Sequence, residues 1–225
     1  MTLVRHAVSL AMLGGFMVVG TQDARSQDVD GLEILESAAV HYGGVSSLCA
    51  DFVQRLEIVL LGDDRTGSGR ICQARPNKFG MRFSDPEGDL VIVDGESIWL
   101  YYPSVDVKQV IRVRVSGSAA GYDLFREFLE RPSEKYTVSY EADEVIAGQT
   151  TRRLRLIPKV RTSYNAAVLW VDAGAPILRR IRIEEENSTV RTLTFADVEL
   201  GPSSLDDSWF VFTPPPGAQV ISRMP

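Results

Sequence analysis

The sequence predicts a mainly β fold, an unclosed (half) antiparallel β-barrel of about eleven strands with a lid of two or three helices. Apolar and polar residues alternate along most of the chain, as where Leu154 and Leu156 oppose Arg153 and Arg155. Short turn sequences such as DPEG and DGE separate these stretches, and only two segments have helical spacing. A large antiparallel sheet with one apolar face curls, and the two helical segments are available to cover that face.

Two helices are expected, and each has an apolar stripe with residues three to four positions apart. The first covers residues 31–42, begins after Asp28 and Asp30, and ends at Gly43. The second covers residues 119–131 and is stopped by Pro132. Its apolar stripe, the predicted lid surface, includes Leu124, Phe125 and Phe128.

The strands follow from alternation between turn signals, and hairpin-length connections favour an antiparallel meander. The expected strands are 51–60, 66–74, 78–84, 90–94, 97–102, 106–115, 136–142, 151–157, 167–171, 177–184, 190–200 and 209–213.

The stretch from Gln73 to Pro103 is the most informative part of this sheet. Large apolar side chains lie at alternate positions on one face of its first strand, and Arg82 and Ser84 lie on the other face. A sheet this large under only two helices predicts an apolar cavity, and a filled core is the alternative. The predicted lining residues are Phe79, Met81, Phe83, Trp99, Tyr101, Leu154, Leu156, Leu169 and Ile181.

Composition limits the class of protein. The 225 residues are 44% hydrophobic, which is enough for one core, and the net charge of −6 argues against nucleic acid as a partner. Residues 27–225 show no linker or repeat, so one domain is expected. Residues 1–26 read as a secretory signal peptide, in which an apolar run at 7–20 precedes a small-x-small site at Ala24 to Ser26. An uncleaved anchor is the alternative, but the run is short for a membrane span.

The two cysteines, Cys49 and Cys72, follow the predicted signal peptide. In an oxidising compartment they are expected to form a disulfide, worth roughly 3 kcal/mol of stability, and two buried free thiols are the alternative. No cysteine directly follows the apolar run to carry a lipid, so a soluble protein is expected. His41 is the single histidine after residue 26, which disfavours zinc, and no other metal or cofactor is expected.

Catalytic motifs are missing from the sequence. Gly67-Ser68-Gly69 has no strand-to-helix context, and no phosphate loop, H-E-x-x-H or C-x-x-C occurs. Carboxylate pairs such as Asp63-Asp64 lie in polar turns. A non-enzymatic function is therefore expected.

The order of several short motifs resembles that of the periplasmic outer-membrane lipoprotein carrier family, the LolA-like proteins. These are Phe52-x-Gln54, Gly67-Ser68-Gly69, RPNKF at 75–79, Pro86, VDG at 93–95, the run IWLYYP, and F-x-F-x-P-P-x-G-A-x-V-I at 210–221. Three features depart from the family pattern. Met81 stands where an aromatic residue is usual, and Cys49 and Cys72 are not part of the motif. Some members carry a further C-terminal strand after the P-P-x-G segment, whereas this sequence stops at Pro225.

The resemblance implies a monomeric periplasmic carrier that takes acylated lipoproteins from an inner-membrane release complex to an outer-membrane acceptor. It also implies that Arg75 bonds backbone carbonyls of the lid and holds the empty cavity shut. A surface arginine before a proline turn is the alternative for this residue. Other functions left open are a lipid or lipoprotein sensor or shuttle of the same fold, an outer-membrane acceptor, a lipid-modifying hydrolase, and a structural envelope protein.

Overall fold

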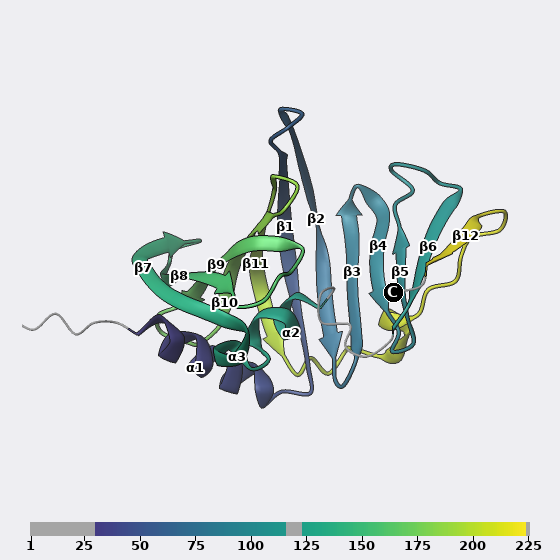
Figure 1. The fold of residues 1–225 in the computed structure, drawn as a ribbon. Helices are drawn as coiled ribbons and strands as arrows, with labels where there is room; N and C mark the ends of the chain where they lie inside the picture. The colour runs from purple at the N-terminus through teal and green to yellow at the C-terminus, as the bar shows by residue number, and fades with distance from the viewer. Residues whose placement is uncertain (1–29, 116–122, 224–225) are drawn as a thin grey trace, which may run out of the picture.

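The computed structural model describes residues 30–115 and 123–223, and the strands in this part of the chain form one twelve-stranded sheet. The strand order is β12-β6-β5-β4-β3-β2-β1-β11-β10-β9-β8-β7 (Figure 1). Neighbours are antiparallel, except that β12 pairs parallel with β6. The outermost strands, β12 and β7, do not pair with each other, so the sheet stays unclosed. The predicted fold class is confirmed.

The strand bounds are β1 Ser47–Ile58, β2 Asp63–Ala74, β3 Lys78–Asp85, β4 Glu87–Val93, β5 Ser97–Tyr101, β6 Gln109–Arg114, β7 Tyr136–Ile146, β8 Gln149–Pro158, β9 Tyr164–Asp172, β10 Leu178–Glu185, β11 Thr189–Leu200 and β12 Gln219–Arg223. The helices are α1 Gly31–Gly43, α2 Leu124–Leu129 and α3 Pro132–Lys135.

The helices lie over one face of the sheet, called here the inner face (Figure 1). Asp30 begins α1 as expected, because its Oδ1 accepts a hydrogen bond of 2.8 Å from the backbone N–H of Leu32. The core beneath the helices contains a row of side chains that are neighbours across β8, β9, β10 and β11. The row consists of Leu154, Leu169, Ile181 and Leu193, all fully buried.

The predicted helix at 119–131 was wrong at its C-terminal end. Residues 119–122 lie outside the described part of the chain. The described helix α2 ends at Leu129, Arg131 takes a left-handed conformation with φ of 51°, and Pro132 begins the separate helix α3. Proline stops a helix before it, but its fixed φ also suits the first position of a new helix.

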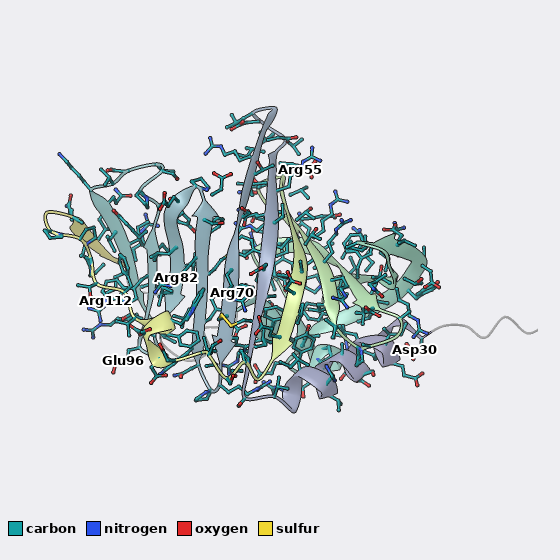
Figure 2. All side chains as sticks on the ribbon, turned by 180° about the vertical axis from the view of Figure 1, so that it is seen from behind. Asp30, Arg55, Arg70, Arg82, Glu96 and Arg112 are labelled. Carbon is teal, nitrogen blue, oxygen red and sulfur yellow. A yellow bond between two sulfur atoms is a disulfide. The ribbon has the colours of Figure 1, made fainter. Side chains whose placement is uncertain are left out.

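The opposite, outer face carries many charged side chains (Figure 2). Arg70 bridges Asp51 and Glu199, with nitrogen–oxygen distances of 2.8 and 2.5 Å. The segment 206–213, called here the C-terminal strap, crosses this face, and Arg82 donates hydrogen bonds to the carbonyls of Trp209 and Val211.

The expected strand at 209–213 was wrong. Residues Asp207–Phe210 form a 3-10 helix. The carbonyl of the next residue, Val211, accepts a hydrogen bond from the Arg82 side chain rather than from a neighbouring strand. The last strand, β12, lies further along the chain and was not predicted. A run of three prolines, Pro214 to Pro216, precedes β12. These prolines have no backbone N–H groups to donate hydrogen bonds to a neighbouring strand.

The first hairpin turns earlier than its polar residues suggest. The strand expected at 51–60 ends at Ile58, and the turn uses Val59 to Gly62 instead of the predicted polar stretch at 62–67. The backbone N–H of Leu61 bonds the carbonyl of Ile58 at 2.9 Å, and Gly62 has a φ of 63°. This hairpin projects beyond the neighbouring strands and carries apolar residues at its tip (Figure 1).

The predicted disulfide is confirmed. Cys49 and Cys72 are directly opposite each other on β1 and β2, and their sulfur atoms are bonded (Figure 2). Both residues are buried on the outer face against Phe210 of the C-terminal strap. The bond therefore lies between the sheet and the strap.

Candidate functional site

An apolar pocket of about 600 Å³ opens between α2 and the inner face of the sheet. Its apolar lining comes from the sheet and from the lid helix: Phe79, Met81, Val91, Leu100, Leu124, Phe128 and Ile183. Polar residues, including Glu127, Glu185 and Arg191, stand among its other lining residues. This volume is typical of a small-molecule site, and the lining combines an apolar wall with these polar groups.

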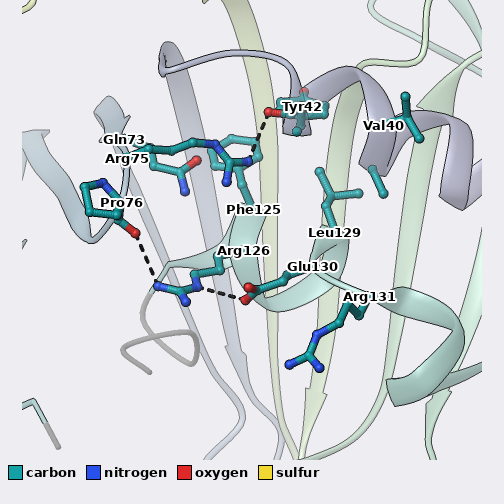
Figure 3. A pocket seen from close by; sticks show the side chains of 12 residues that line it. Val40, Tyr42, Gln73, Arg75, Pro76, Phe125, Arg126, Leu129, Glu130 and Arg131 are labelled. Carbon is teal, nitrogen blue, oxygen red and sulfur yellow. Dashed lines mark hydrogen bonds and ion pairs between the residues drawn. The ribbon is translucent and has the colours of Figure 1, made fainter. Parts of the chain in front are cut away.

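Arg75 fastens the end of α1 to the sheet. Its Nε donates to the carbonyl of Val45 at 3.0 Å, and its Nη2 donates to the carbonyl of Tyr42 at 3.1 Å. Figure 3 shows Arg75 reaching Tyr42 across a second pocket of about 540 Å³. One guanidinium can bond several carbonyls because its donors form a rigid fork.

A buried carboxyl group holds the start of α2. Asp123 accepts hydrogen bonds from the backbone N–H of Arg126 at 3.1 Å and from the side-chain amide of Gln73 on β2. Burial raises the pKa of Asp123 to about 6, although the bonds from Arg126 and Gln73 and the charges of Arg126 and Arg75 oppose this.

A third polar cluster fastens α2 to β7 and β9. The hydroxyls of Tyr136 and Tyr164 each donate to the Glu127 carboxylate, at 2.9 and 2.6 Å, and lie 2.8 Å from each other. The Lys135 amine donates to the Glu127 carbonyl at 2.6 Å. Burial and hydrogen bonding raise the pKa of both tyrosines, so the hydroxyls stay protonated as donors. These three clusters are among the polar contacts that attach the described lid helices to the sheet.

Asp123 predicts a distinct pH dependence of stability. Its pKa is raised above the ordinary 3.8, so between pH about 4 and 6 the folded chain keeps a proton that the unfolded chain releases. The free energy of unfolding therefore falls as pH rises through this interval, by on the order of 2 kcal/mol from this group. Asp123→Asn removes the titration, and we expect its stability relative to the wild type to increase from low to neutral pH in urea unfolding.

Asp94→Asn is a control in which the stability relative to the wild type should change with pH in the opposite direction. Burial opposes ionisation of Asp94, but hydrogen bonds from Trp99, Glu96 and Ser97 lower its pKa. Its carboxylate therefore adds stability as pH rises, and Asp94→Asn should lose stability relative to the wild type in that direction. A constant difference between Asp123→Asn and the wild type over the whole pH range would contradict the Asp123 prediction.

Several predicted site residues lie at or near the pocket. Phe79 and Met81 line it from β3, and Leu124 and Phe128 line it from α2. Phe83 lies on the inner face and meets the ring of Phe52 at 5.1 Å. Other predicted residues lie in the inner-face core or against the second pocket. Leu154, Leu156, Leu169 and Ile181 are fully buried and line neither pocket, and Phe125 stacks on Tyr42 beside the second pocket.

The placement of Trp99 and Tyr101 on the pocket side was wrong. Both lie on the outer face, where they meet the ring of Phe212 at 5.9 and 5.5 Å. The residues of β5 that face inward are Ile98 and Leu100. The C-terminal strap covers the outer face here, so both faces of this strand carry large side chains.

The polar attachments of the lid helices were not all predicted. Asp123 directly precedes the apolar run that begins at Leu124, which is a helix N-cap pattern that could have identified it. Glu127, Tyr136 and Tyr164 are distant in sequence and carry no shared local signal. None of the helices formed by the described residues has the length and apolar character needed to cross a bilayer.

Comparison with known proteins relates the chain to one family. A family model described as "Outer membrane lipoprotein carrier protein LolA" matches residues 43–213. An outer-membrane lipoprotein carrier protein of Xanthomonas axonopodis pv. citri is 27% identical over 180 residues, covering 79% of this chain and 83% of the relative. The same-named protein of Haemophilus influenzae is 27% identical over 177 residues, covering 78% and 80%.

Solved structures agree on the fold. An uncharacterized conserved protein from Thermus thermophilus superimposes with a TM-score of 0.54 at 15% identity, covering 85% of this chain and 98% of that chain. The family match spans most of the chain, including the Arg75 region and the lining of the apolar pocket. The chain therefore belongs to the LolA family of outer-membrane lipoprotein carrier proteins, a non-enzymatic family.

Proposed function

We propose that this protein is a soluble periplasmic carrier that shields the acyl chains of lipoproteins between the inner and outer membranes. The observation that supports this most is the apolar pocket beneath α2, in a molecule whose lid helices are fastened by polar contacts. Apolar contact with few directional bonds suits acyl chains, which differ in length and position but share their chemistry.

The physical need for such a pocket is large. Exposing an acyl chain to water costs about 0.8 kcal/mol per CH₂ group, so a lipoprotein with several chains does not cross an aqueous compartment alone at a useful rate. Met81 in the pocket wall suits this task, because a flexible thioether adapts to ligands of different shape.

Loading requires movement of the lid. A pocket of about 600 Å³ has the size of a small-molecule site, whereas a lipoprotein brings several long chains. Lifting the helices would expose the buried inner-face row that includes Leu154, Leu169 and Ile181. In this proposal these residues complete the cavity, and the Arg75 bonds break on loading and form again on release.

The partners follow from the same proposal. An inner-membrane release complex would supply the lipoprotein, and an outer-membrane acceptor with tighter binding would take it. Reforming the Arg75 bonds to Tyr42 and Val45 favours the empty carrier and so assists the transfer.

The experiment is to purify the mature protein from the periplasm under mild conditions and identify co-purifying material by mass spectrometry. Acylated lipoprotein peptides are expected in the wild type and absent from a Leu100→Asp variant, which places a charge in the pocket wall. Free phospholipid in place of lipoprotein would identify a lipid shuttle of the same fold instead. Absence of any acylated material from the wild type would contradict the carrier function.

A further inference from the structure

Three loops that expose aliphatic side chains lie at the same end of the sheet, called here the mouth end. In the strand register, Ile58 at the end of β1 lies opposite Thr189 at the start of β11, and Tyr164 at the start of β9 lies opposite Glu185 at the end of β10. Tyr101 at the end of β5 lies opposite Leu90 on β4. The β1–β2, β5–β6 and β8–β9 loops therefore leave the sheet at the same end. The apolar pocket reaches this end, because Tyr102, Thr162 and Glu185 are among its lining residues.

Each of these loops exposes large aliphatic side chains. They are Val59, Leu60 and Leu61 in the first loop, Val105 and Val107 in the second, and Val160 in the third, all between 59% and 77% exposed. The first loop is the projecting hairpin tip (Figure 1). Isolated exposed aliphatic residues are ordinary, but their concentration at the end of the sheet that the apolar pocket reaches marks an interaction surface.

The charges beside the first loop are neutralised by pairing, and Arg161 of the third loop pairs with Glu186 at 3.2 Å. Arg55 pairs with Asp64 at 2.6 Å, and Arg65 pairs with Asp63 at 2.9 Å, both beside the hairpin tip. The chain as a whole is acidic, with a net charge of −6. This surface is therefore suited to the insertion of apolar side chains into lipid rather than to attraction of anionic phosphate groups.

We propose that the β1–β2, β5–β6 and β8–β9 loops form a lipid-docking surface that dips its aliphatic tips into a bilayer while the pocket mouth faces the membrane. The exposed tips belong to separate loops, so a rigid protein partner would need a matching hollow for each of them. A fluid bilayer surface accepts all of them at once. The inference rests on the carrier function proposed above, because a carrier exchanges its cargo with partners that lie at membrane surfaces.

The test is flotation of the full mature chain with phosphatidylcholine vesicles, at low and high salt. The wild type is expected to float with the vesicles at both salt concentrations. Leu60→Asp/Leu61→Asp should weaken the vesicle partition by about tenfold or more, since each leucine exchanges apolar burial for a charge. Val105→Asp/Val107→Asp should weaken it in the same direction.

Val145→Asp is the matched control, because Val145 is 69% exposed but lies on β7 towards the other end of the sheet. It should float like the wild type. Equal flotation of the tip variant and the wild type overturns the docking surface, as does equal loss in the Val145 control. Binding only to phosphatidylglycerol vesicles at low salt overturns it as well. A dimer in sedimentation that the tip substitutions dissolve would show that a second copy, and not lipid, covers these loops.

A separate readout distinguishes this proposal from the carrier function. Retention of a palmitoylated peptide is measured in solution without vesicles. The tip variants should retain the peptide at the wild-type level while losing flotation, which supports the docking surface. Failure of the wild type to retain the peptide overturns the carrier function, whereas the flotation series decides the docking surface by itself.

Discussion

Arg75→Leu is expected to keep lipoprotein bound at least as firmly as the wild type and to transfer it to an acceptor about tenfold more slowly. The substitution removes the hydrogen bonds to the carbonyls of Tyr42 and Val45 that favour the closed, empty state. Bonds to charged groups contribute about 1.5–3 kcal/mol each when buried, but Arg75 is exposed to solvent, so about 1.4 kcal/mol in total is expected. That free energy corresponds to a factor of ten.

The measurement is the rate of lipoprotein transfer from loaded carrier to acceptor, followed together with the amount retained. Arg131→Leu is the matched control, since Arg131 lines the same second pocket but its side chain pairs with Glu134 and not with α1. Arg131→Leu should transfer at the wild-type rate. Arg75→Lys should be intermediate, because a single ammonium group replaces the fork. Wild-type transfer by Arg75→Leu would contradict the role of the arginine.

Cys49→Ala/Cys72→Ala is expected to lower the free energy of unfolding by about 3 kcal/mol, from the lost constraint on the unfolded chain. For a domain of this size the melting temperature should fall by about 6–12 °C. The two cysteines are buried against Phe210, so the C-terminal strap should also pack less firmly on the outer face.

Calorimetry of the double variant and of the wild type measures this effect, with reduction of the wild type as a second route to the same state. The inner face lies on the opposite side of the sheet, so acyl-peptide retention at low temperature should stay unchanged. A melting temperature within a degree or two of the wild type would contradict the stabilising role of the bond. Loss of retention in a folded double variant would contradict the separation of the two faces.

Alternation predicted the architecture well where one face of a strand is polar. Leu154 and Ile181 could be assigned to the core because arginines alternate with them in β8 and β10. Arg75 bonds carbonyls at the end of α1 and in the loop that follows, and its role as a latch stays a prediction.

Alternation of polar and apolar residues failed to predict the inward side chains of a strand that is covered on both faces. In β5 every residue from Ile98 to Tyr101 is large and apolar or aromatic, so the pattern does not say which face is inward. The C-terminal strap that covers Trp99 and Tyr101 comes from a segment more than a hundred residues away, and Arg82 holds it by its carbonyls. Such long-range cover leaves no local signal in the sequence.

Local rules also misplaced two boundaries. The polar stretch after Gly62 suggested the hairpin turn, yet the chain turns at the apolar residues before it. Pro132 was expected only to end a helix, but it also begins α3. Both errors arise because a turn residue fixes a local conformation without fixing which element it serves.

The central claim is that acyl chains occupy the inner-face pocket, and the neighbouring residues Leu100 and Trp99 allow the most direct test. Leu100 lines the pocket, whereas Trp99 lies on the outer face against Phe212. A photoreactive benzophenone side chain is placed at one position or the other, and each variant is loaded with an acylated lipoprotein peptide and irradiated. The account predicts a covalent adduct with the acyl chain from position 100 and none from position 99. Equal adducts from both positions, or an adduct only from position 99, would contradict it.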